Sequence, residues 1–421
     1  MKGVVWMEVV HPRCAGLDVS KKDAKVCVRV QGTGGRRTES TVTTWGSMTR
    51  QIMELREYLI SQRVTWVVME ATGDYWKPFY YLFEDAPFET VLANPTQVRA
   101  IPGRKSDVSD AAWLADLGAH GLVHGSFVPP PPIRELRDLT RARTALSQER
   151  TREWQRMEKL LEDAGIKLSV VASSLTLVSV RLMLEALVAG ERDPQVLANL
   201  AKGKLRNKID LLNEALFGHF GNHHAFMVQL HLGVIDQLEA SITQLEQRIE
   251  VMVAPFQGFC DLIRTIPGID VIVAQVVLAE IGTDIRANFP TAGHLASWAG
   301  VVPSSNSSAG RTKSTKARPG NRHLKGALGM AAETVARSPG TFLNAKYRRV
   351  AARGGNQRAN VAIQHAILTA IWNMAGTGEL YNDLGADYHR GRHPERTKRH
   401  ALAQLQAMGY SVTLNPLENA S

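Results

Sequence analysis

Four carboxylates in the first 110 residues have the types and spacing for metal-assisted chemistry. Asp18 lies in GLDVS at the start of a predicted strand, and Glu70 ends the apolar run TWVVME. A carboxylate that ends an apolar strand is costly unless it reaches solvent, a partner or a cation. Asp107 and Asp110 are three residues apart on a predicted helix and so share one face. A helix cap at Ser106, with Asp107 in the first turn, is the structural alternative for this pair.

The four acids as a set indicate a function that no single one of them indicates. Carboxylates that converge at one edge of a sheet repel one another unless divalent cations neutralise them. Their hard oxygen ligands suit Mg²⁺ or Mn²⁺, which also bind phosphate oxygens. The set therefore predicts a metal site for phosphate chemistry.

A second candidate is the serine cluster SSNSSAGRTK, residues 304–313. It has four serines within five positions, followed by Arg311 and Lys313. A serine hydroxyl is a weak nucleophile at neutral pH and needs a base, a cation or a strong positive potential to lose its proton. The decapeptide alone fits equally a flexible linker and an activated hydroxyl held against a phosphate.

Composition narrows the class of partner. The 421 residues carry a formal charge of +10 and a pI near 9.6, which favours a polyanionic partner over an acidic small molecule. The three cysteines are scattered and indicate neither disulfides nor a zinc site. The chain shows no signal peptide and no run of 18 apolar residues. We therefore expect a soluble, cytoplasmic protein without membrane contact.

The elements that must position these groups begin with an α/β domain. Residues 14–128 read as alternating strands and helices, which predicts a largely buried sheet behind an N-terminal extension, residues 1–13. Within it, Ser47 is a candidate helix cap. The proline run VPPPPI, residues 128–133, predicts a domain boundary because it continues neither helix nor central strand.

A helical region, residues 129–256, follows. It contains two long predicted helices, near 133–165 and 226–253, the second with coiled-coil spacing. An intramolecular hairpin and a dimer seam both explain this pattern. The first helix has four arginines that are candidates for RNA or DNA phosphate contact, with a solvated helix face as the alternative: Arg134, Arg137, Arg141 and Arg143.

The last predicted domain, residues 257–375, is mainly helical. A turn at Pro267–Gly268 resembles a helix-hairpin-helix, which can direct backbone N–H groups at phosphate; tight helical packing explains it equally well. The tail, residues 376–421, is basic and polar, and no fold is assigned to it.

Several blocks of the first domain resemble one family. GLDVSKKDAKVCV, VVMEATGDYWKPFYYLFE, NPTQVRA and RKSDVSDAAWLAD, in this order, are similar to the successive blocks of the DEDD insertion-sequence transposases. That family includes the Piv-type DNA invertases and the bridge-RNA-guided recombinases. The resemblance implies a RuvC-like domain of the ribonuclease H fold. It also implies a catalytic, metal-binding tetrad at Asp18, Glu70, Asp107 and Asp110.

The C-terminal blocks of the same family extend the resemblance. They correspond here to IPGI (266–269), WAGVVPSSNSSAGRTK (298–313) and KARPGNRHLKGAL (316–328). Counting from Pro303, the family's nucleophilic serine falls on Ser308. Ala309 stands where many relatives have glycine, so Ser307 remains a rival. Five cations are then candidates for holding the scissile phosphate: Arg311, Lys313, Lys316, Arg318 and Arg322.

The resemblance implies a DNA transposase or recombinase that acts through a covalent 5′-phosphoserine. Its implied partners are donor DNA, target DNA, a noncoding bridge RNA and further copies of the chain, as dimers that pair into tetramers. Two alternatives remain. One is a metal-dependent nuclease of Holliday-junction-resolvase type, in which Ser308 is structural; the other is a catalytically inactive nucleic-acid-binding regulator.

Overall fold

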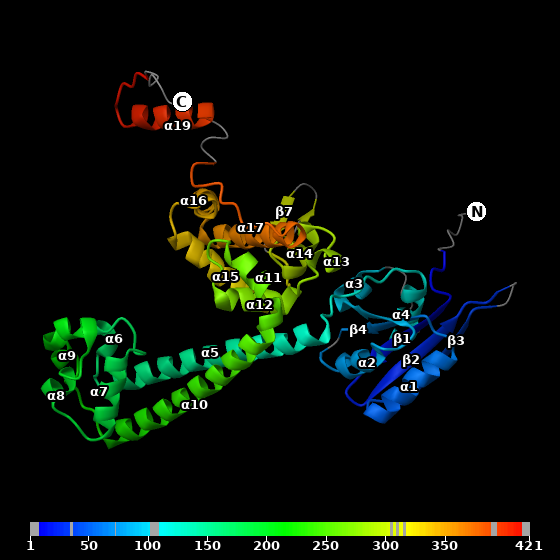
Figure 1. Cartoon of the computed structure of the whole chain (residues 1–421), viewed down its shortest axis with the longest axis horizontal. Coiled ribbons are helices and arrows are strands. Elements are labelled where there is room, and N and C mark those ends of the chain that lie inside the picture. The colour runs from blue at the N-terminus through cyan, green and yellow to red at the C-terminus, as the bar shows by residue number, and fades with distance from the viewer. Residues whose placement is uncertain are drawn as a thin grey trace. The chain divides into compact units, whose positions relative to one another are not determined.

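The computed structural model divides the chain into two compact units, Met1–Val128 and Pro129–Ser421 (Figure 1). It describes residues 8–33, 37–71, 73–101, 109–303, 306–308, 311–314, 317–388 and 394–414. The division falls at the proline run. Over these described ranges, no helix has the length and apolar character needed to cross a bilayer.

The first unit is built on one mixed sheet of five strands. In space their order is β3-β2-β1-β4-β5. β2 runs antiparallel to β1 and β3, whereas β1, β4 and β5 run parallel to one another. The α/β prediction is therefore confirmed. The strands are β1 (Arg13–Val19), β2 (Asp23–Val30), β3 (Glu39–Gly46), β4 (Trp66–Glu70) and β5 (Glu89–Ala93).

Helices cover both faces of this sheet. Alternation along β1 sends Ala15 and Leu17 into a core shared with α1 and α2, while Cys14 packs with α4 on the opposite face. β4 alternates in the same way, with Met69 on the α1 side and Val68 on the α4 side. The helices are α1 (Thr49–Ser61), α2 (Trp76–Phe83), α3 (Pro95–Ala100) and α4 (Asp110–Ala119).

Two helix starts differ from the sequence prediction. α1 begins at Thr49 without a side-chain cap, because the Ser47 hydroxyl donates to the carbonyl of Lys21 instead (2.9 Å). α4 begins at Asp110, and its cap is Ser109, whose Oγ accepts from the amide of Ala112 (3.3 Å). Ser106 and Asp107, the predicted cap and first turn, lie outside the described residues.

The second unit starts with a long helical hairpin. α5 (Pro131–Asp163) and α10 (Asn222–Val253) lie side by side (Figure 1). Contacts such as Glu153–His231 (2.5 Å) and Arg150–Glu239 (3.7 Å) show that they are antiparallel. Their buried faces therefore pack within one chain. A helical cap connects them: α6 (Leu168–Val171), α7 (Val178–Val188), α8 (Pro194–Ala198), the 3₁₀ helix η1 (Gly203–Lys208) and α9 (Ile209–Ala215).

The rest of this unit is a helical assembly that carries a short β-hairpin. At the Pro267–Gly268 turn, Gly268 has φ +92°, and an added Cβ would lie 2.5 Å from the carbonyl oxygen of Ala331. Close packing of the turn on α15 thus explains its glycine. The elements are η2 (Ala254–Phe256), α11 (Gln257–Arg264), α12 (Val271–Ile281), α13 (Ile285–Asn288), α14 (Ala292–Ala299), β6 (Asn306–Ser308), β7 (Arg311–Ser314), α15 (Arg322–Arg337), α16 (Phe342–Gly354), α17 (Asn356–Thr377) and α19 (Pro394–Ala407). The last of these is a helix in the tail, to which the sequence assigned no fold.

Candidate active site: a carboxylate cluster and a serine hairpin

Strand register brings Asp18 and Glu70 together. β1 and β4 are parallel and in register at Leu17 and Met69, so Asp18 and Glu70 come one residue later on neighbouring strands. Both share the parity of Cys14 and Val68, whose side chains face α4. Asp18 is the sixth residue of β1, near its end, and not at the start of a strand as the sequence suggested. The two carboxylates therefore leave the same sheet edge on the same face.

Helix α4 brings the third acid, Asp110, to this edge. The helix packs so closely on β1 that a Cβ on Gly16 would lie 2.2 Å from the carbonyl oxygen of Ala111. An ion pair between Arg29 of β2 and Asp116 (3.2 Å) ties the same helix to the sheet. Asp110, the first helical residue, is thereby placed over the end of β1.

The three carboxylates also affect one another electrostatically. Burial, followed by the negative charges of Asp110 and Glu70, raises the pKa of Asp18 above its ordinary value of 3.8. Glu70 and Asp110 also line one small pocket of about 70 Å³ together with Arg99 of α3. Asp107 lies outside the described residues, and among the residues that are described no three acids, histidines or cysteines form a group able to hold a metal ion.

The serine candidates lie on the β6–β7 hairpin of the second unit. Ser308 is the last residue of β6, and its register partner is Arg311; the partner of Ser307 is Thr312. Lys313 is on β7, whereas Lys316 is outside the described residues. The hairpin therefore pairs the backbone of the predicted nucleophile with that of a cationic residue.

Close backbone packing holds the base of this hairpin. Pro303 and Ala317 form an isolated antiparallel bridge. The segments that enter and leave the hairpin also cross at Gly300 and Gly320. An added Cβ on Gly320 would lie 2.4 Å from the amide nitrogen of Gly300, so glycine is required at this crossing. The Lys325 ammonium donates to the carbonyl of Gly300 (3.2 Å).

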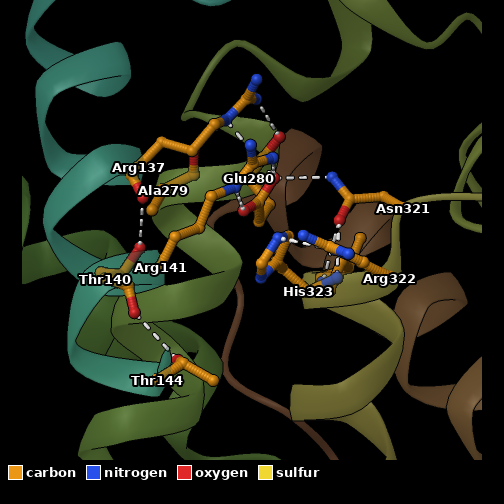
Figure 2. Close-up of polar contacts among 10 residues, drawn as sticks. Arg137, Thr140, Arg141, Thr144, Ala279, Glu280, Asn321, Arg322 and His323 are labelled. Carbon is orange, nitrogen blue, oxygen red and sulfur yellow. Dashed lines mark hydrogen bonds and ion pairs between the residues drawn. The ribbon is translucent and has the colours of Figure 1, made fainter. Parts of the chain in front are cut away.

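A buried carboxylate anchors the segment that leaves the hairpin. Glu280 of α12 is fully buried and accepts two hydrogen bonds from Arg141 of α5, each 2.8 Å (Figure 2). Asn321 donates to the same carboxylate (2.6 Å) and caps α15 by accepting from the amides of His323 and Leu324. Glu280 therefore joins α5 and α12 to the start of α15, the helix that follows the hairpin.

The predicted phosphate-binding arginines of α5 have intramolecular partners. Arg137 donates to the carbonyls of Ala279 (3.1 Å) and Glu280 (2.7 Å), as Figure 2 shows. Arg143 is buried and donates to the side chain of Gln275 (2.5 Å). Arg137, Arg141 and Arg143 thus fasten α5 to α12 and do not form a solvated face. Arg318 and Arg322, by contrast, are exposed near the hairpin.

Sequence reasoning missed Glu280, Asn321 and Arg99. A usable signal existed for Glu280, because it is the one charged residue in the apolar helix VIVAQVVLAEI, and an isolated charge in such a helix requires partners. Arg99 lies in the NPTQVRA block, but only the packing of α3 against α4 places it beside the acids.

Comparisons with known proteins match two separate stretches of the chain. Residues 15–166 match a family model described as a transposase of the IS110 DEDD type, and residues 260–348 match the transposase IS116/IS110/IS902 family. A curated relative, the insertion element IS110 uncharacterized 43.6 kDa protein of Streptomyces coelicolor, is 32% identical over 106 residues. That match covers 24% of this chain and only 26% of the relative. The two family matches contain the carboxylate cluster and the serine hairpin respectively, and the chain belongs to the IS110 family of DEDD transposases.

Proposed function

We propose that the chain is the DNA transposase of an insertion sequence, which cuts and rejoins strands through its acidic cluster and Ser308. The observation that carries the proposal is the convergence of Asp18, Glu70 and Asp110 at one sheet edge, inside the segment that matches a transposase model. The same proposal includes a RuvC-like fold for the first unit, with Asp107 as the fourth acid.

The proposal includes a divalent cation at this cluster, with Asp107 completing a set of acids that the three described carboxylates do not complete alone. Burial, followed by the negative charges of Asp110 and Glu70, raises the pKa of Asp18, and a bound cation relieves that repulsion. Carboxylate oxygens are the ligands that Mg²⁺ and Mn²⁺ prefer, so Asp18, Glu70 and Asp110, together with Asp107, would hold the ion. When bound, the ion supplies charge stabilisation for phosphate oxygens.

Serine chemistry completes the proposed reaction. The Ser308 oxygen attacks the phosphorus of a phosphodiester, the bond to the 3′-oxygen breaks, and the serine proton passes to that oxygen. The products are a 5′-phosphoserine and a free 3′-hydroxyl. A second 3′-hydroxyl then attacks the phosphoserine, restores the serine and rejoins the strand. Arg311, the register partner of Ser308, and the exposed Arg318 and Arg322 support this assignment, because cations favour the charged transition state.

Covalent trapping tests the proposal. DNA carrying the gene with its native flanks is labelled at its 3′ termini, since the fragment downstream of the cut carries the phosphoserine. We expect a labelled protein–DNA adduct from the unchanged chain, and none from Ser308→Ala or Asp18→Ala. Ser307→Ala is the matched control and should retain the adduct.

The alternative functions give different results in this assay. Cleavage by Ser308→Ala at the normal rate, with free 5′-phosphate ends and no adduct, would indicate the metal-dependent nuclease. Binding without cleavage by the unchanged chain would indicate the inactive regulator.

The proposal includes self-association. Phe226, Leu230 and Val234 are spaced four residues apart on α10, and their exposed fractions are 64%, 53% and 39%. An apolar row of this kind on the long hairpin fits a contact with a second copy of the chain. Sedimentation analysis should show dimers or tetramers that Leu230→Glu weakens; an unchanged sedimentation profile would contradict this contact.

The proposal also includes a guide RNA. The net charge of +10 and the family resemblance support binding of a structured RNA encoded beside the gene. Sequencing of RNA that copurifies with the chain, expressed together with its flanking DNA, tests this part. Recovery of no enriched flanking transcript would refute it.

A further inference from the structure

A pocket of about 980 Å³ opens at the base of the serine hairpin. We call it the hairpin-base pocket. Its wall includes Val301 to Pro303, just before the hairpin, and Ala317, just after it. The remaining described lining residues come from α15, α16 and α17.

One face of α17 forms much of this pocket. Arg358, Val361, Ala362 and His365 all line it, and their spacing of three, four and seven residues places them on a single helical face. Lys346 of α16 lies against the same cavity. The helices α16 and α17 therefore form part of the pocket wall.

The charges in the pocket have one sign. Lys325, Lys346 and Arg358 line it, and none of the described lining residues is acidic. No hydrogen bond or ion pair joins the Lys346 ammonium to another described residue. Burial, followed by the charge of Arg349, lowers the pKa of Lys346, and burial, followed by the charge of Lys346, lowers that of His365. A positive potential in a half-buried site favours an anionic ligand.

The apolar part of the lining restricts the ligand further. Val302, Val361 and Ala362 offer apolar surface that a lone phosphate would not use. A nucleotide has both parts, since its phosphate pairs with cations and its base or sugar packs on apolar side chains. The pocket can admit a segment of one strand but not a double helix, in which the bases are stacked inside.

We propose that the hairpin-base pocket binds an unpaired nucleotide of a nucleic-acid strand, with Lys346 and Arg358 on its phosphate. The inference rests on the proposed function in one respect. In that function, the bound nucleotide is an unpaired one that lies beside the strand joined to Ser308. Single-stranded DNA at the cut and single-stranded RNA share this chemistry, so the test includes both.

Binding of short fluorescent oligonucleotides tests the inference. The full chain carries Ser308→Ala, so that the measurement does not depend on covalent chemistry. Lys346→Gln combined with Arg358→Gln should weaken binding of a single strand by about tenfold or more, because each change removes a charge-assisted contact. Duplex binding should change by less than about threefold.

A matched control separates the pocket from general basic charge. Arg348→Gln combined with Arg353→Gln removes two exposed charges, both on α16 and neither in the pocket lining. These changes should affect single strands and duplexes alike, and only slightly. An equal loss in both double variants, or a duplex that depends on Lys346 and Arg358 as strongly as a single strand does, overturns the inference. Whether the DNA or the RNA arm responds identifies the natural strand.

The two proposals fail independently. If the unchanged chain forms no covalent adduct but single-strand binding still depends on Lys346 and Arg358, the transposase chemistry is refuted. The nucleotide site is then still supported. A normal adduct without any effect of the pocket variants on binding of either strand refutes the site alone.

Discussion

Replacing Glu280 with glutamine removes one negative charge from the centre of the second unit. The glutamine amide keeps the size of the side chain, and its oxygen can still accept from Asn321. It cannot accept both hydrogen bonds from Arg141, and it leaves that guanidinium and Arg137 without their carboxylate. The change therefore isolates the contribution of charge from that of shape.

The expected magnitude follows from burial. The Glu280 side chain is 0% exposed, and those of Arg137 and Arg141 are 14% and 35% exposed. Removing one partner of a buried ion pair costs about 3–5 kcal/mol, and we expect the lower end because both arginines retain access to water. A loss of about 3 kcal/mol lowers the melting temperature by about 5 °C in a unit of this size, since the entropy of unfolding scales with the number of residues.

Thermal denaturation followed by circular dichroism measures the total loss, and amide hydrogen exchange locates it. Two units need not unfold in one step, so exchange in α12 and α15 is the decisive signal. Glu239→Gln is the matched control. Its carboxylate is 50% exposed and lies 3.7 Å from Arg150 of α5, so the change should cost less than about 1 kcal/mol.

The pH dependence provides a second check. Burial alone raises the pKa of Glu280, but hydrogen bonding by Arg141 and the charges of Arg137 and Arg141 outweigh it and lower the pKa below 4.5. The stabilisation is therefore present above the unfolded-state pKa and is lost as pH falls through the lower folded-state pKa. The unchanged chain and Glu280→Gln should converge in stability in acid. Equal stability of Glu280→Gln and Glu239→Gln at pH 7 would refute the reasoning.

Three further changes test the positioning of the two candidate sites. Gly16→Ala inserts a Cβ 2.2 Å from a backbone oxygen of α4 and should cost about 1–3 kcal/mol or more in urea denaturation, whereas Gly125→Ala, with its nearest neighbour at 3.4 Å, should be nearly neutral. Asp18→Asn should stabilise the metal-free chain at pH 7 by less than about 1 kcal/mol, because the pKa of Asp18 is raised and its ionised form costs stability as pH rises through that pKa. Thermal denaturation in the presence of a chelator should show this gain. Added Mg²⁺ should no longer raise the melting temperature of the variant. Gly320→Ala should reduce the yield of the covalent protein–DNA adduct at least about tenfold, because it displaces the base of the hairpin. Gly326→Ala, in open space on α15, should leave the yield unchanged. Equal adduct yields from these two variants would contradict the role of the glycine crossing.

Much of the local structure follows from patterns in the sequence. The apolar run before Glu70 ends as a strand at that residue, and the Pro129–Pro132 run coincides with the unit boundary. The start of α4 was less predictable, because Ser106 and Ser109 both offer a capping hydroxyl and both precede an aspartate. Local propensity does not choose between two such caps; the packing of Gly16 against Ala111 supports the observed start.

The long helices also show that a local sequence pattern does not choose between two structural alternatives. Apolar residues at spacings of three and four along α10 predict a buried seam, but the same pattern serves a partner helix from this chain or from another. The return path through the cap, residues 164–221, brings α10 back along α5 and satisfies much of that seam internally.

By itself, the sequence determined which groups are available for chemistry, because residue types and their order in recognisable blocks are local properties: Asp18, Glu70, Asp110 and Ser308 are all named without coordinates. Only the tertiary structure decided which side chains meet. The register of β1 with β4 places two acids side by side, Glu280 receives arginines from a helix 139 residues away in the chain, and α17 faces the base of the hairpin to form a pocket. Such contacts depend on long-range packing, whose free energy belongs to pairs of surfaces and not to any one segment.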